Sequence, residues 1–188
     1  MDILAPLQPG ERFHPHTIPL HFVDRLVKTH DLKVFVETGT YLGFTVEHVL
    51  DKFEKVYTIE LDLLLYEQAS EKFKAHKNVR CVRGDSGEKL ADILYFIKHR
   101  RALIWLDAHW SAGITARGSK DTAIVAELDA LREAPRLDHV LMIDDLADFT
   151  GQNGYPTVDE LRQRVREINP LYVVHVLDIR RGVLLAIP

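Results

Sequence analysis

Acidic residues follow nearly every segment of this sequence that is rich in β-forming residues. They are Glu37, Glu60, Asp85, Asp107, Asp144 and Asp145. Any single one has an ordinary explanation as a helix cap, because a carboxylate there accepts hydrogen bonds from backbone N–H groups. Capping alone does not explain a series at corresponding positions. In an open parallel sheet the carboxyl ends of the strands border the ligand crevice, so the series predicts a ligand-binding site.

The segment from residue 34 to residue 45 has the pattern of a nucleoside-binding turn. A short β run ends in Glu37, Gly39 and Gly43 follow, and an amphipathic helix pattern begins directly afterwards. The dinucleotide fingerprint G-x-G-x-x-G is absent. A carboxylate before the first glycine repels a pyrophosphate but suits a cationic amino group. The turn therefore predicts a site for a nucleoside that carries an amino acid.

The other acidic positions suit the remaining parts of such a ligand. Glu60, at the end of the second predicted strand, is placed to accept hydrogen bonds from two ribose hydroxyls. Asp85 and Ser86, after the third, can accept one from the exocyclic amine of adenine. Thr45, at the start of a helix, can bond the carboxylate of the amino-acid end.

These positions depend on a regular order of elements. A helix pattern over residues 17–31 precedes five β runs, each followed by a helix pattern, and the β runs 171–177 and 183–187 close the chain as an antiparallel hairpin. Alternating strands and helices form a parallel sheet covered on both faces. We expect a Rossmann-like α/β fold with a seven-stranded, mostly parallel sheet. It forms a single domain over residues 17–188, after an irregular arm over residues 1–16.

The whole chain excludes several other classes of protein. Its 188 residues suit one well-cored domain, and 46% of them are hydrophobic. The net charge is −4 and the basic residues are scattered, so neither nucleic acid nor a membrane is an expected partner. A single cysteine, Cys81, fits a reducing compartment. Without a signal-peptide pattern or a long apolar run, the expected location is the cytoplasm.

The ordered set of motifs resembles the class I S-adenosylmethionine-dependent methyltransferases over about residues 20 to 188. Their first motif, an acid followed by x-G-x-x-x-G, is matched by Glu37-Thr-Gly39-Thr-Tyr-Leu-Gly43, and their later acids by Glu60 and Asp85. The resemblance implies an S-adenosylmethionine site. Its positions are Glu37, Gly39, Tyr41, Gly43, Thr45, Glu60, Asp85, Ser86 and Asp107. For the Tyr41 side chain, a packing role is the alternative.

The last two parallel strand ends resemble the metal-binding ends of the divalent-cation-dependent O-methyltransferases of the catechol and macrolide-sugar types. The matching segments are Leu106-Asp107-Ala-His-Trp110 and Ile143-Asp144-Asp145. Carboxylates crowded in one cleft repel one another without a cation, and Mg²⁺ prefers oxygen ligands. The resemblance therefore implies a Mg²⁺ site at Asp107, Asp144 and Asp145. The alternative is that Asp107 contacts only the cofactor amine while the other two cap a loop.

The sequence departs from the catechol type at the general base. No lysine lies shortly after Asp107, and His109 is the nearest titratable residue. An imidazole removes protons efficiently near neutral pH. We therefore expect His109 and Asp107 to be the catalytic residues. Packing of His109 beside Trp110 is the alternative.

Substrate specificity is expected from segments outside the sheet. These are the arm over residues 1–16 and the loops over residues 108–119 and 146–156. In the last of them Phe149 and Tyr155 either stack on a substrate ring or are solvated, and solvated loop residues are the simpler interpretation.

The function expected from these features is Mg²⁺-assisted O-methylation of a hydroxyl on a small molecule by S-adenosylmethionine. A sugar or secondary metabolite is the expected acceptor, because catechol-type enzymes usually keep the lysine that is missing here. The alternative is a non-catalytic accessory protein that binds S-adenosylmethionine with the same fold. The sequence leaves the oligomeric state open, with a homodimer as one option.

Overall fold

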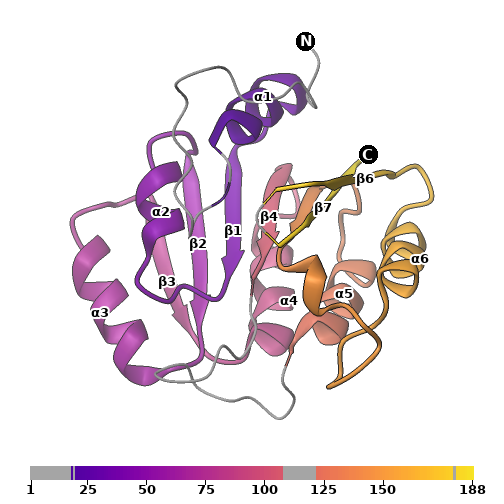
Figure 1. Cartoon of the computed structure of the whole chain (residues 1–188). Helices are drawn as coiled ribbons and strands as arrows, with labels where there is room; N and C mark the ends of the chain where they lie inside the picture. Colours follow the sequence, from indigo (N-terminus) through magenta and orange to yellow (C-terminus); the bar gives the residue numbers. More distant parts are fainter. Residues whose placement is uncertain (1–17, 19, 108–121, 180) are drawn as a thin grey trace.

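The structure is a computed structural model that describes residues 18, 20–107, 122–179 and 181–188. The predicted alternation of strands and helices is present throughout this part of the chain (Figure 1). The elements are α1 Leu20–His30, β1 Val34–Thr38, α2 Phe44–Val49, β2 Lys55–Glu60, α3 Leu63–Phe73, β3 Val79–Arg83, α4 Ser86–Phe96, β4 Ala102–Leu106, α5 Ile124–Arg132, β5 Val140–Ile143, the 3₁₀ helix η1 Leu146–Asp148, α6 Val158–Ile168, β6 Val173–Leu177 and β7 Val183–Ile187.

The strands form one sheet in the order β3-β2-β1-β4-β5-β7-β6. The pairings among β1, β2, β3, β4 and β5 are all parallel, whereas β7 pairs antiparallel with both β5 and β6. The strand order reverses between β1 and β4, which is the switch point where such sheets bind ligands. The seven-stranded, mostly parallel sheet with a terminal hairpin is confirmed.

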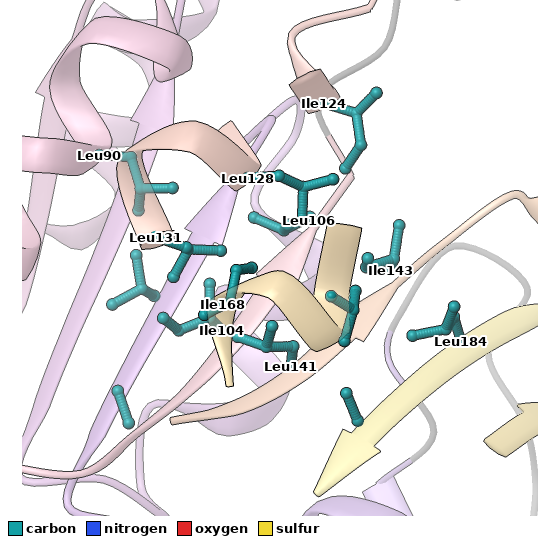
Figure 2. Close-up of a cluster of buried hydrophobic side chains, with 14 of the residues drawn as sticks. Leu90, Ile104, Leu106, Ile124, Leu128, Leu131, Leu141, Ile143, Ile168 and Leu184 are labelled. Atoms are coloured by element: carbon teal, nitrogen blue, oxygen red, sulfur yellow. The ribbon is translucent and has the colours of Figure 1, made fainter. Parts of the chain in front are cut away.

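Two hydrophobic clusters cover the two faces of the sheet. One packs α1, α2 and α3 against residues such as Phe35 and Trp105. The other packs α4, α5 and α6 against Val36, Ile104 and Leu141, and Figure 2 shows its centre. Because successive strand residues point to opposite faces, neighbouring residues of β1 belong to different clusters. The strands therefore read as continuous apolar runs.

Helix starts are fixed locally by side chains that accept backbone N–H bonds. Asp62 caps α3, Asp85 caps α4, and Thr157 forms a full capping box with Glu160 at α6. Each cap follows the end of a strand or a loop, so it sets where the chain turns back over the sheet. Within the described residues, no helix combines the length and apolar character needed to cross a membrane.

Candidate active site

The strand ends that meet at the switch point are those of β1, β4 and β5. Their registers align Thr38 of β1 with Leu106 of β4, and Leu106 with Ile143 of β5. The residues that follow are consequently neighbours: the N–H of Asp144 donates to the carbonyl of Leu106, and the N–H of Asp107 donates to Thr38 Oγ1 at 3.1 Å. The sheet therefore brings together the acidic positions that are far apart in the sequence.

Glu37 is buried on the α2 side of β1. Its Oε2 accepts a 2.6 Å hydrogen bond from Thr58 Oγ1 of β2, and Thr58 lies 2.5 Å from Thr40 Oγ1. Burial raises the pKa of Glu37 to about 8, while hydrogen bonds from Thr58 and Thr45 oppose that rise. Thr45 is thus beside Glu37. A cationic group placed next to Glu37 would favour its ionised form.

The turn after β1 is held by its backbone. The N–H groups of Gly39 and Thr40 both donate to the carbonyl of Ile59 in β2. Gly39 and Gly43 have left-handed φ values of 80° and 74°, which glycine adopts at little cost. A Cβ on Gly43 would lie 2.7 Å from the ring of Phe73 in α3. This glycine is therefore required by close packing of the turn against α3 as well as by its φ.

Glu60, at the end of β2, connects that turn to the next helix. One of its carboxylate oxygens accepts from the N–H of Tyr41 at 2.8 Å, and the other accepts from the N–H of Asp62 at 2.9 Å. A carboxylate oxygen can accept more than one hydrogen bond. Glu60 consequently keeps the acceptor capacity that two ribose hydroxyls require. Tyr41 as a whole residue is 42% exposed, so it is not part of the buried core.

Asp85 and Ser86 lie where β3 ends and α4 begins. Asp85 Oδ1 accepts from the N–H of Gly87 at 2.9 Å and so acts as the helix cap. Ser86 is buried. The capping interpretation of Asp85 is therefore confirmed.

Asp107, Asp144 and Asp145 form a cluster of carboxylates. One oxygen from each lies within 4.8 Å of the others. Asp144 is 3% exposed, and the indole N–H of Trp105 donates to Asp107 Oδ2 at 3.3 Å. Such an all-oxygen set, with one buried and two partly exposed carboxylates, suits a hard cation such as Mg²⁺. These three residues fit the ion that the sequence predicted.

Asp145 also has a partner of opposite charge. It has a left-handed φ of 53° and precedes η1. Its Oδ1 lies 3.3 Å from Nε of Arg181, and Arg181 also pairs with Asp148. The positive charge of Arg181 therefore stands beside the cluster. Asp145 therefore precedes η1 and belongs to the carboxylate cluster at the same time, so the two roles do not exclude each other.

The cluster opens into a small hollow between α5 and the ends of β4 and β5. Besides the three aspartates, its lining comprises Leu106, Thr122, Ile124, Glu127, Ile143, Phe149 and Tyr155. Phe149 is only 6% exposed and meets Tyr155 edge to face, with ring centroids 5.3 Å apart. The expectation that Phe149 is a solvated loop residue is wrong, because its ring completes the core beneath the hollow.

Glu127 is a residue of the site that the sequence analysis did not identify. It is 1% exposed and is the only carboxylate among the buried residues of α5. The signal for it exists in the sequence: it stands three residues after Ile124 and four before Leu131, within the apolar stripe of the helix.

His109, the expected general base, lies outside the described residues, as do Trp110 and the rest of the loop over residues 108–119. The arm over residues 1–16 lies outside them as well. These assignments stay predictions.

This Rossmann-like fold is shared with solved structures of methyltransferases. No protein-family model and no curated protein matches the sequence. Among solved structures, a Staphylococcus aureus protein provisionally described as a caffeoyl-CoA O-methyltransferase superposes with a TM-score of 0.59 at 18% identity, covering 89% of this chain and 81% of that one. A provisionally described Streptococcus mutans methyltransferase, in complex with S-adenosylhomocysteine, gives 0.53 at 16% identity, with coverage of 87% and 97%.

Spermidine synthase, solved with the transition-state analogue AdoDATO, has the same fold. Its TM-score is 0.56 at 19% identity, with 82% of this chain and 54% of that chain covered. At these identities the likeness establishes the architecture. The chemistry must be argued from the site itself.

Proposed function

We propose that this protein is an S-adenosylmethionine-dependent methyltransferase that methylates a hydroxyl of a small molecule with the assistance of Mg²⁺. The observation that carries the proposal is the position of Asp107. It belongs to the series of strand-end acids that suits the methyl donor, and it also belongs to the cluster with Asp144 and Asp145. Asp107 therefore lies both at the expected site of the methyl donor and at the expected site of the metal ion and the acceptor.

The donor half is assigned to the ends of β1, β2 and β3. Glu60 would accept from the ribose hydroxyls, Asp85 from the adenine amine, and Glu37 would face the cationic amino-acid end. Hydrogen bonds from Thr58, Tyr41 and Gly87 would hold these carboxylates in place before the ligand arrives, and the bond from Thr58 is fully buried. Because these acceptors are already ordered, ligand binding costs little of their conformational entropy.

The acceptor half is assigned to the aspartate cluster. In the reaction the acceptor oxygen attacks the methyl carbon, the bond from that carbon to sulfur breaks, and the hydroxyl proton leaves to a base. Mg²⁺, when bound by Asp107, Asp144 and Asp145, supplies a Lewis acid that makes a bound hydroxyl easier to deprotonate. Trp105 would fix the direction of the Asp107 carboxylate through its indole N–H.

A second function is favoured by the contact of Arg181 with Asp145. The guanidinium at 3.3 Å partly neutralises the cluster without any metal ion. A protein that binds S-adenosylmethionine without catalysis would fit that arrangement. Turnover separates the two functions, because both predict cofactor binding but only the enzyme consumes it.

The cofactor assignment is tested by denaturing mass spectrometry of the purified protein. Co-purified S-adenosylmethionine or S-adenosylhomocysteine is the expected result. Thermal unfolding with added S-adenosylhomocysteine, with Mg²⁺ and with chelator then measures separately how much the cofactor and the metal ion stabilise the protein. If neither form of the cofactor stabilises the protein, the methyltransferase proposal fails.

A further inference from the structure

Glu127 is a buried carboxylate in an apolar helix face. It lies on α5 among Ile124, Leu128 and Leu131, which Figure 2 shows packed toward β4 and β5. Its Oε1 has no hydrogen-bond partner within the described part of the chain. A buried polar atom without a partner destabilises a fold. Such an atom therefore needs an explanation outside packing.

Glu127 interacts with residues at the ends of neighbouring strands. Burial raises its pKa to about 7, hydrogen bonds from Ser86 and Thr38 oppose that rise, and the negative charges of Asp85 and Asp107 add to it. The start of α4 lies directly against α5 here, since a Cβ on Gly87 would be 2.7 Å from that of Ala126.

Glu127 lines the same hollow as the aspartate cluster. Within the residues described, the carboxylates close enough to share an ion are Asp107, Asp144 and Asp145, and Glu127 is not among them. Glu127 therefore lies outside the group of carboxylates that could bind the ion directly. Mg²⁺ characteristically keeps several of its waters when it binds a protein. Waters on a bound ion need acceptors, and such outer carboxylates strongly affect metal affinity.

We propose that Glu127 is a positioning residue for the cation site, where its Oε1 accepts a hydrogen bond from a water carried by the ion that the three aspartates hold. The inference rests on the proposed Mg²⁺ site. It accounts for the carboxylate in an apolar stripe and for its unpartnered oxygen, and it assigns α5 a part in the site.

The test is isothermal titration of MgCl₂ into the full-length protein at pH 8, with the Glu127→Met and Glu127→Gln variants. Glu127→Met removes the acceptor and should weaken Mg²⁺ binding by about 10- to 100-fold, the usual effect of losing an outer partner. Glu127→Gln keeps an amide oxygen and should show a smaller loss. The control is Glu133→Gln, an exposed residue just after the same helix, which should match the wild type.

Thermal unfolding without and with Mg²⁺ distinguishes this role from a purely structural one. Glu127→Met removes the acceptor of the Ser86 and Thr38 hydrogen bonds, so it should unfold earlier than the wild type without Mg²⁺. Added Mg²⁺ should also raise its melting temperature by less than that of the wild type, whereas a purely structural role predicts an equal rise. If Glu127→Met does not fold, the Glu127→Gln titration carries the test.

The outcomes separate the two proposals. Folded variants that bind Mg²⁺ as tightly as the wild type overturn the role of Glu127 and leave the aspartate site standing. A wild-type protein that shows no Mg²⁺ binding overturns the metal site and, with it, the role of Glu127.

Discussion

Thr58 Oγ1 of β2 donates a 2.6 Å hydrogen bond to Glu37 Oε2 of β1, and both residues are fully or almost fully buried. This bond ties the acid of the glycine turn to the neighbouring strand. It does not offset the burial of the carboxylate, because the pKa of Glu37 still rises to about 8. The pKa of Glu37 is therefore well above its ordinary value at the position where the cationic end of the cofactor is expected.

The first prediction concerns stability as a function of pH. Because the pKa of Glu37 is raised in the folded state, its contribution to stability is fully present below about pH 4.5 and is lost as pH rises through about 8. Replacing Glu37 by Gln keeps an acceptor for Thr58 but removes the ionisation. We expect the melting temperature of this variant to decline less between pH 5 and pH 8.5 than that of the wild type.

Thermal unfolding of the ligand-free protein at several pH values measures the effect. A chain of this length changes its melting temperature by about 2–4 °C for each kcal/mol. Glu133→Gln, at an exposed position, should follow the wild-type curve. Parallel curves for Glu37→Gln and the wild type would contradict the assignment.

The second prediction concerns Gly43. Alanine there must adopt a left-handed φ, which costs roughly 1–2 kcal/mol, and its Cβ must also displace the buried Phe73 ring, which lies 2.7 Å away. Gly154→Ala is the matched control, because it has a φ of 87° and its nearest neighbour is 4.0 Å away. Gly43→Ala should be the more destabilised of the two by about 1–3 kcal/mol, the usual cost of overpacking.

Chemical denaturation of both variants gives the comparison. Adding Phe73→Leu to Gly43→Ala should recover part of the difference, since it makes room for the methyl group. Equal losses in the two alanine variants would show that φ alone, and not contact with α3, requires glycine at this position.

The third prediction concerns Arg181. Its guanidinium lies 3.3 Å from Asp145 and competes electrostatically with a cation in the cluster. Arg181→Gln should tighten Mg²⁺ binding by roughly threefold, because exposed charges a few ångströms apart interact by about 1 kcal/mol or less. The effect should shrink at high salt.

Arg100→Gln is the control for this measurement. Arg100 pairs with Glu54 at 3.1 Å. Both residues shortly precede strands, β4 and β2, so they lie at the amino ends of the strands, away from the aspartate cluster. It should leave Mg²⁺ binding unchanged. Weaker Mg²⁺ binding in Arg181→Gln would mean that Arg181 orients Asp145 for the ion and does not compete with it.

The sequence predicts the sheet well because its strands are short apolar runs that each end in a polar turn. β1 and β4 are buried along their whole length. Glu37, near the end of β1, and Asp107, directly after β4, both lie at the switch point as expected. The glycine turn was also predictable, since its left-handed residues and its acid have direct sequence signatures.

Residues that depend on tertiary packing were harder to predict. Phe149 follows a 3₁₀ helix in a loop, and only the fold shows that its ring is buried against Tyr155. Glu127 falls within an apolar stripe, where a helix pattern alone does not reveal whether the glutamate faces solvent or a site. The reach of Arg181 to Asp145 depends on the hairpin turning back over η1, where the N–H of Ala147 donates to the Arg181 carbonyl.

The central claim is that the strand-end acids form a site for S-adenosylmethionine, and calorimetric titration of S-adenosylhomocysteine tests it most directly. We predict one site per chain, with binding weakened about tenfold or more in Glu60→Gln, because a hydrogen bond to a charged group contributes about 1.5–3 kcal/mol. Glu54→Gln, just before the start of the same strand, should bind as the wild type does. Absence of binding to the wild-type protein, or equal binding by Glu60→Gln, would contradict the account.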